Sequence, residues 1–379
     1  MAVSETAAGK RLFPLLAVLL AALTTLGLLE LTAWALLHKK WPRTPPIPTN
    51  EWVVLTGHGK RLRPNLDFTQ WFLVSNQVVH FQTNSLGIRG REISLTKTAG
   101  VTRVLVLGDS ITLSPFLPEE EVFPARVQQM LSASKPVEVI NAGVSDMGMK
   151  EELLLLKETG LRLKPDLVLI GFYLNDSRPP WGFENEYYRL SPRLIEFSKT
   201  VEQYSYLYKL VWKRLLVSHF LGRKAPNRWD WRKEYVNGDW RTDSSSYQRV
   251  IQGADLDFGA AWQQESWKAI DQGLAQFQDL AREYDFKLAI LIFPVAVQVK
   301  SLVADDYPQQ QMKKLCETRK IPCLDLLPIL KQHQGEDIYF DHCHLNALGH
   351  QIISRHIADF LAPLIAPARD EQTGTRSEK

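Results

Sequence analysis

Short apolar runs recur through the middle of the chain, and most are followed by a stretch whose apolar residues recur at helical spacing. The runs predict buried strands, because a strand covered on both faces is apolar at nearly every position. They lie at 102–108, 137–140, 166–173, 287–293 and 321–326. The helical stretches lie near 121–133, 149–162, 260–284, 306–319 and 346–363. Strands that alternate with helices predict an α/β fold with a parallel sheet covered on both faces.

Two segments depart from this alternation. Residues 51–100 carry short β-like pieces, such as 52–55 and 78–81, with turn residues between them. Residues 177–258 form a long insertion between the third and fourth strands, first helical in pattern and then irregular and aromatic. Insertions in such folds collect at the loop edges of the sheet, so we expect this one to form a lid or a wall.

The N-terminus is apolar from residue 13 to residue 37, with Glu30 as its one charge and basic residues on both sides. A membrane-spanning helix needs about 20 mostly apolar residues, and this stretch is long enough. A cleaved signal peptide is the alternative, because 33–35 (Ala-Trp-Ala) resembles a cleavage site. The apolar run exceeds a signal core of roughly 7–15 residues, however, which favours an uncleaved, single-pass signal-anchor. A short tail before a long body predicts the N-terminus inside and the body on the extracytoplasmic (periplasmic) side.

These features predict the domain organisation. One large folded domain carries both the β-rich lead-in and the insertion. The predicted segments are a tail at 1–12, the anchor at 13–37, a proline-rich linker at 38–50, the domain at 51–366 and a disordered tail at 367–379.

Composition narrows the function only slightly. The 379 residues are 45% hydrophobic and 23% charged, which is ordinary for a globular protein. A net charge of +3 gives no electrostatic case for binding nucleic acid. Cys316, Cys323 and Cys343 show no CxxC spacing, so buried thiols are favoured over a bridge between the first two. The sequence does not indicate the oligomeric state.

Polar motifs follow the first three predicted strands, and a fourth precedes the last helix. Each one alone is most simply a turn or a helix cap. In chain order they are Gly108-Asp109-Ser110, Asn141-Ala142-Gly143, Leu174-Asn175-Asp176, and the segment Asp341-His342-Cys343-His344. The carboxyl ends of parallel strands meet at one edge of a sheet, so we expect the first three motifs to lie together.

Together the motifs supply the parts of a serine hydrolase. Serine needs a base to become a nucleophile, and His344 is the candidate base for Ser110, with Asp341 accepting the proton of its other ring nitrogen. A developing oxyanion also needs donors. The candidates are the backbone N–H of Gly143, the amide of Asn175 and the backbone N–H of Ser110 at a helix start.

The histidines near the C-terminus also allow a different interpretation. Asp341, His342, His344 and His350 could suggest a metal site. Further ligands at a recognisable spacing are lacking, and His350 falls inside the last helical pattern. We therefore predict no metal and no cofactor.

With these motifs the chain resembles the SGNH, or GDSL-type, hydrolase superfamily over about residues 100–363, except for the insertion. The matching positions are Ser110 in GDSIT, Gly143 in NAGV, Asn175 in YLND, and Asp341 with His344 in DHCH. The resemblance implies a flavodoxin-like three-layer α/β/α sandwich and a serine esterase that needs no cofactor.

Two details refine the resemblance. Tyr173 stands where the family often has glycine, two residues before the asparagine, and we expect it to tighten the wall of the oxyanion pocket. The segment 81–92 (FQTNSLGIRGRE) also resembles a lead-in of membrane-anchored bacterial members, several of them linked to exported polysaccharides.

The expected function is therefore a membrane-anchored esterase that hydrolyses an acyl ester, such as O-acetyl, on a carbohydrate or an exported polysaccharide. Tryptophans of the insertion could stack on sugar rings, although packing is the favoured role for each: Trp181, Trp229, Trp231 and Trp240. Alternatives are an O-acetyltransferase with the same site, and a lipid esterase that uses the amphipathic stretch 204–216. A non-catalytic binding module fits less well, because all five catalytic positions are intact.

Overall fold

The computed structural model describes residues 7–37, 52–56, 59–72, 74–133, 135–177, 201, 205–211, 228–255 and 257–366. The chain divides into two compact units. The smaller comprises Met1–Asn50 and Arg189–Pro226, and the larger comprises Glu51–Tyr188 and Asn227–Lys379. The predicted linker, the predicted C-terminal tail and Trp181 lie outside the described residues, as does much of the insertion between 178 and 227.

The larger unit is built on a parallel sheet of five strands. The strands are β5 (Thr102–Gly108), β6 (Val137–Asn141), β7 (Leu167–Tyr173), β8 (Lys287–Phe293) and β9 (Cys323–Asp325). Their spatial order is β6-β5-β7-β8-β9, with every neighbouring pair parallel. In chain order this is the 2-1-3-4-5 arrangement of flavodoxin-like folds, so the expected sheet is confirmed.

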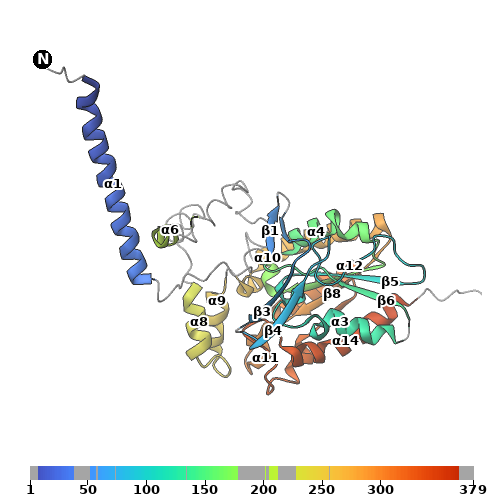
Figure 1. The fold of residues 1–379 in the computed structure, drawn as a ribbon. Coiled ribbons are helices and arrows are strands. Elements are labelled where there is room, and N and C mark those ends of the chain that lie inside the picture. Colours follow the sequence, from blue (N-terminus) through green and yellow to red (C-terminus); the bar gives the residue numbers. More distant parts are fainter. Residues whose placement is uncertain are drawn as a thin grey trace, which may run out of the picture. The chain divides into compact units, whose positions relative to one another are not determined.

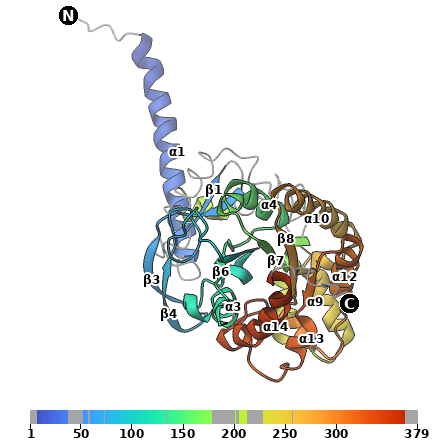
Figure 2. The ribbon, with the colours of Figure 1, turned by 90° about the vertical axis from the view of Figure 1, so that its right-hand side faces the viewer.

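Helices cover both faces of this sheet (Figures 1 and 2). The helices α3 (Phe123–Ser132) and α14 (Ala347–Ile365) pack together on one face. On the other face lie α4 (Met149–Glu158), α10 (Gln264–Tyr284) and α12 (Tyr307–Arg319). The short helices α11 (Ala296–Lys300) and α13 (Leu327–Lys331) follow β8 and β9. The three-layer α/β/α sandwich is thus confirmed.

The lead-in forms two antiparallel hairpins. One pairs β1 (Val53–Thr56) with β2 (Gly59–Leu62), and the other pairs β3 (Asp67–Phe72) with β4 (Gln77–Gln82). Aromatic rings of this region pack on one another, with Trp52 4.9 Å from Phe81 and 5.9 Å from Phe72 between ring centroids. The β-rich lead-in is therefore stabilised by an aromatic cluster of its own.

The second part of the insertion belongs to the larger unit and forms α8 (Arg228–Asn237) and α9 (Ser244–Gly253). Trp231 is only 4% exposed, and Trp240 is fully buried with its ring stacked on Tyr235 at 5.3 Å. Neither face is open to a sugar ring, so the packing role is confirmed for these two residues. The side chain of Trp229 lies outside the described part of the chain.

The smaller unit contains the long helix α1 (Ala7–Leu37) and the short helix α6 (Tyr206–Val211). Residues Leu16–Leu36 are long and apolar enough to cross a membrane, although a signal sequence has the same properties. The helix begins at Ala7, inside the tail predicted from the sequence. Its one acidic side chain, Glu30, accepts hydrogen bonds from the backbone N–H of Tyr206 at 2.6 Å and from the Ser205 hydroxyl at 2.7 Å.

Candidate active site

The candidate nucleophile lies on a one-turn helix, α2 (Ser110–Leu113), directly after strand β5, which lies between β6 and β7 in the sheet. Its cap is Asp109, whose carboxylate accepts the N–H of Ile111 at 2.8 Å. The helix lies very close to the sheet, because a Cβ on Gly108 would come within 2.1 Å of the Thr112 hydroxyl oxygen. A Cβ on Gly171 of β7 would come within 2.4 Å of the same atom. Glycine at these two strand positions thus lets α2 seat Ser110 at the carboxyl edge of the sheet.

The structure brings Ser110, His344 and Asp341 into one hydrogen-bonded series. The Ser110 hydroxyl lies 3.0 Å from Nε2 of His344, and Nδ1 of His344 lies 2.8 Å from Oδ2 of Asp341. The other carboxylate oxygen of Asp341 accepts the backbone N–H groups of Cys343 at 2.9 Å and His344 at 2.8 Å. Both carboxylate oxygens are therefore fixed by the loop that carries the histidine.

The surroundings of Asp341 keep its carboxylate ionised. Burial alone would raise the pKa of Asp341, but the side-chain and backbone hydrogen bonds from His344 hold it well below its ordinary value. The carboxylate is thus ionised at neutral pH and accepts the Nδ1 proton of His344. A neutral imidazole with Nδ1 protonated turns an acceptor, Nε2, toward Ser110. The Phe116 ring packs edge-on against this imidazole at 5.0 Å and further limits its orientation.

The two further oxyanion candidates pack around α2. Nδ2 of Asn175 donates to Oδ2 of Asp109 at 3.1 Å, and its second N–H is a further donor. The Gly143 backbone is pressed against the helix, because a Cβ there would lie 2.4 Å from the Leu113 nitrogen. The Gly143 N–H donates to Oδ1 of Asn141 at 3.1 Å, so a role toward an oxyanion requires sharing or exchanging that bond. The Ser110 N–H stands at the first position of α2, where helices leave N–H groups without intrahelical acceptors.

Sequence reasoning did not identify the second contact of Asp109. Its buried carboxylate both caps α2 and holds the amide of Asn175. The available signal was its place between Gly108 and Ser110, where a cap was the simplest interpretation. The partner residue lies 66 positions away, which local sequence patterns do not indicate.

Tyr173, two residues before Asn175, ends strand β7 and is 1% exposed. Its hydroxyl has no hydrogen-bond partner within the described part of the chain. Burial raises the pKa of this phenol, and the negative charge of nearby carboxylates such as Asp257 raises it further. The phenol is therefore neutral at physiological pH.

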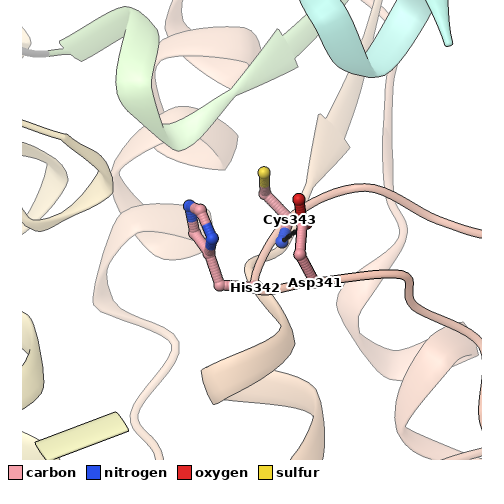
Figure 3. Close-up of side chains that lie close together, drawn as sticks. All are labelled: Asp341, His342 and Cys343. Atoms are coloured by element: carbon pink, nitrogen blue, oxygen red, sulfur yellow. Dashed lines mark hydrogen bonds between the residues drawn. The ribbon is translucent and has the colours of Figure 1, made fainter. Parts of the chain in front are cut away.

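Potential metal ligands also gather on the histidine loop. One ligand atom from each of Asp341, His342 and Cys343 lies within 4.8 Å of the others (Figure 3). The Asp341 oxygens are already used by the loop and by His344, and Nε2 of His342 lies 3.7 Å from Oδ2 of Asp257. Burial raises the pKa of the Cys343 thiol, which disfavours the thiolate that metals bind. This donor set does not fit a metal ion well.

His350, the remaining histidine of the metal interpretation, is fully buried and lies on α14. Nδ1 accepts the backbone N–H of Phe123 at 3.1 Å, and Nε2 lies 2.8 Å from the Ser114 hydroxyl. Both ring nitrogens are therefore engaged by the protein itself.

Comparison with known protein families agrees with this chemistry. The model of the GDSL-like lipase/acylhydrolase family matches residues 106–352. A search of curated proteins gives no match. Similar solved structures include TesA, at 16% identity over 69% of this chain and 99% of that one, with a TM-score of 0.38. The psychrotrophic esterase EstA from Pseudoalteromonas sp. is 14% identical over 70% and 98%, with a TM-score of 0.38. Axe2, an acetylxylan esterase from Geobacillus stearothermophilus, is 12% identical over 71% and 97%, with a TM-score of 0.37.

Proposed function

The chain belongs to the GDSL-like lipase/acylhydrolase family and is a serine hydrolase acting on ester bonds, and from this premise we propose that it is a membrane-anchored esterase that removes a short acyl group, such as O-acetyl, from a carbohydrate. The observation that supports this most is the hydrogen-bonded series from the Ser110 hydroxyl through His344 to Asp341.

In the proposed mechanism Nε2 of His344 takes the Ser110 proton as the serine oxygen attacks the ester carbonyl. Asp341 holds the imidazole and stabilises the positive charge that develops on it. The negative charge on the former carbonyl oxygen is stabilised by N–H groups of Asn175, Gly143 and Ser110. The imidazolium then returns its proton to the departing alcohol. A water, deprotonated by the same histidine, hydrolyses the acyl-serine.

Two bulky side chains support a short acyl group. Phe116 packs against the imidazole of His344, and Tyr173 fills a position that is often glycine in the family. We infer that these two side chains narrow the space beside the reacting carbonyl. Acetyl is a short acyl group, and a carbohydrate substrate fits the lead-in resemblance at 81–92.

The helix Leu16–Leu36 supports attachment to a membrane. We propose that it is an uncleaved anchor with the esterase on the extracytoplasmic side, where an exported polysaccharide would be accessible.

A covalent probe and a substrate panel test the proposal on the purified full chain in detergent. A fluorophosphonate should label the wild type at Ser110, mapped by mass spectrometry, and leave Ser110→Ala unlabelled. Acetylated sugars and short acyl esters should be hydrolysed by the wild type and not by the variant. Labelling at another residue would overturn the assignment of the nucleophile. Transfer of acetyl to an added sugar in preference to water would instead indicate an O-acetyltransferase.

A further inference from the structure

The helix that carries the candidate nucleophile is too short to be stable on its own. Helix α2 has four residues, and its end is marked by Ser114 in the left-handed conformation with φ at 45°. One turn fixes several backbone angles for very few hydrogen bonds, so such a short helix is unfavourable alone. Its last carbonyl groups also lack intrahelical donors. The position of Ser110 therefore depends on groups outside the helix.

Arg89 supplies donors to the end of this helix. Its guanidinium donates through Nη1 to the carbonyl oxygens of Leu113 and Ser114, the latter at 2.8 Å, and through Nη2 to Leu117 at 2.6 Å. The residue is 4% exposed. A planar guanidinium offers several donors in a fixed fork, which suits a set of converging carbonyl groups. Burial lowers the Arg89 pKa to about 10, with Glu119 and Glu120 acting against the decrease, so the side chain stays cationic at neutral pH.

The loop that carries Arg89 is fixed by hydrogen bonds of its own. Oδ1 of Asn84 accepts the N–H groups of Leu86 and Ile88, each at 3.0 Å. The Gly90 N–H donates to the Gln82 carbonyl at 3.0 Å, and the Arg89 guanidinium lies over the Phe81 ring at 5.1 Å. This loop is the segment 81–92 that the esterase mechanism does not otherwise use.

The C-terminal end of α2, which accepts the hydrogen bonds from Arg89, also contacts a candidate oxyanion donor. Gly143 is packed directly on the Leu113 nitrogen. The carbonyl oxygen of the same residue accepts a hydrogen bond from Arg89. A shift of this turn would change the positions of Ser110 and Gly143 relative to His344. Misplacement of reacting groups by about 1 Å can reduce a rate about 100-fold.

We propose that Arg89 is a positioning residue for the nucleophile, which acts by fixing the C-terminal end of α2. The role rests on the proposed function, because it concerns the same site. Through Arg89, the lead-in would then contribute to catalysis as well as to the folded structure.

The test compares Arg89→Lys with Arg103→Lys in the full chain. Lysine keeps the positive charge but cannot reproduce the fork. Arg103 is a matched control, since it is 2% exposed and also donates to backbone carbonyls, those of Leu163 and Ser94. It lies near the start of β5, at the opposite end of the strand from Ser110.

For Arg89→Lys we expect kcat on a short acyl ester and the rate of fluorophosphonate labelling of Ser110 to fall by about 10- to 100-fold, with KM within about twofold. Arg103→Lys should lower the melting temperature and leave both rates unchanged. If Arg89→Lys does not fold, Asn84→Ala keeps the arginine, loosens its loop and should lower the same two rates less strongly.

The positioning role would be overturned if Arg89→Lys melts early but reacts at the wild-type rates when folded. The same result for Asn84→Ala would overturn it where Arg89→Lys does not fold. Labelling does not depend on the natural substrate, so a wrong substrate class leaves this test intact. Absence of labelling in the wild type would overturn the esterase proposal and the role of Arg89 with it.

Discussion

At the residue scale, the two oxygens of Asp109 connect the candidate nucleophile with a candidate oxyanion donor. One oxygen accepts the N–H of Ile111 in α2, and the other accepts Nδ2 of Asn175 after β7. The carboxylate is completely buried, so water does not compete for these bonds. The amide of Asn175 is therefore fixed before a substrate binds, as oxyanion stabilisation requires.

Replacing Asn175 by alanine should separate a role in catalysis from a role in the turn. Loss of one oxyanion donor should lower kcat about 100- to 1000-fold, or about 3–4 kcal/mol, because the donor serves the transition state more than the ground state. Steady-state kinetics and thermal melting would measure this. Asp109 keeps its bond to Ile111, so the melting temperature should fall little.

Gln309→Ala is the control for Asn175, since it removes a buried amide that pairs with Gln298 at 2.9 Å. This control should melt earlier and keep its kcat. The opposite pattern for Asn175→Ala, early melting with normal turnover, would assign that residue to the turn.

The sequence could predict the members of the site but not the bonds that position them. Ser110, Gly143 and Asn175 were expected together because each follows a strand of one parallel sheet, and the sheet order agrees. Asp109 gave only the local signal of a helix cap, and Arg89 was one charged residue within the segment 81–92. Their partners lie 66 and 24–28 residues away, at distances that only folding brings together.

At the element scale, His350 on α14 joins three helices. Nδ1 accepts the Phe123 N–H at the start of α3, so the neutral ring carries its proton on Nε2 and donates it to Ser114 after α2. The Ser114 hydroxyl in turn donates a hydrogen bond to the Ile111 carbonyl oxygen at 2.7 Å. A charged His350 would place an N–H against the Phe123 N–H and break this arrangement.

This network predicts loss of stability in mild acid. Burial lowers the His350 pKa to about 3, with positive charge at Arg126 and Arg89 adding to the effect. The unfolded chain, with a histidine pKa near 6.5, therefore binds more protons between pH 6.5 and 3. Over that window the free energy of unfolding should fall as pH falls, by about 1.4 kcal/mol per pH unit from this one group.

Denaturant unfolding at pH 7, 6, 5 and 4 would measure the effect. His350→Gln should show a shallower decline than the wild type, and His356→Gln, an exposed position on the same helix, should match the wild type. Equal slopes for all three proteins would show that His350 does not contribute.

At the scale of the whole molecule, the chain divides into a smaller unit that contains α1 and α6 and a larger α/β unit. The pattern of the sequence was sufficient for the sheet, because buried parallel strands are nearly uniform in polarity. The aromatic half of the insertion was harder to interpret. Trp231 and Trp240 are buried, and aromatic composition alone does not separate core packing from an open binding face.

Membrane attachment is the prediction at this scale. If α1 is retained, the full chain should sediment with membranes and resist extraction by high salt or alkaline carbonate, because its apolar helix would be buried in lipid. Immunoblotting of the fractions would show this. A mature N-terminus at Leu36, found by N-terminal sequencing, would identify a cleaved signal peptide instead.

The separation of Ser110 from His344 by 234 residues has a consequence for biosynthesis. A ribosome that adds about 5–20 residues per second takes roughly 10–50 s to travel from the codon of one to that of the other. Throughout that interval the nascent chain carries the serine without its base. Asp341 and His344, by contrast, are made within one loop and emerge together. The proposed nucleophile is therefore latent during synthesis, and an incomplete chain released before the last loop would carry Ser110 without hydrolytic activity.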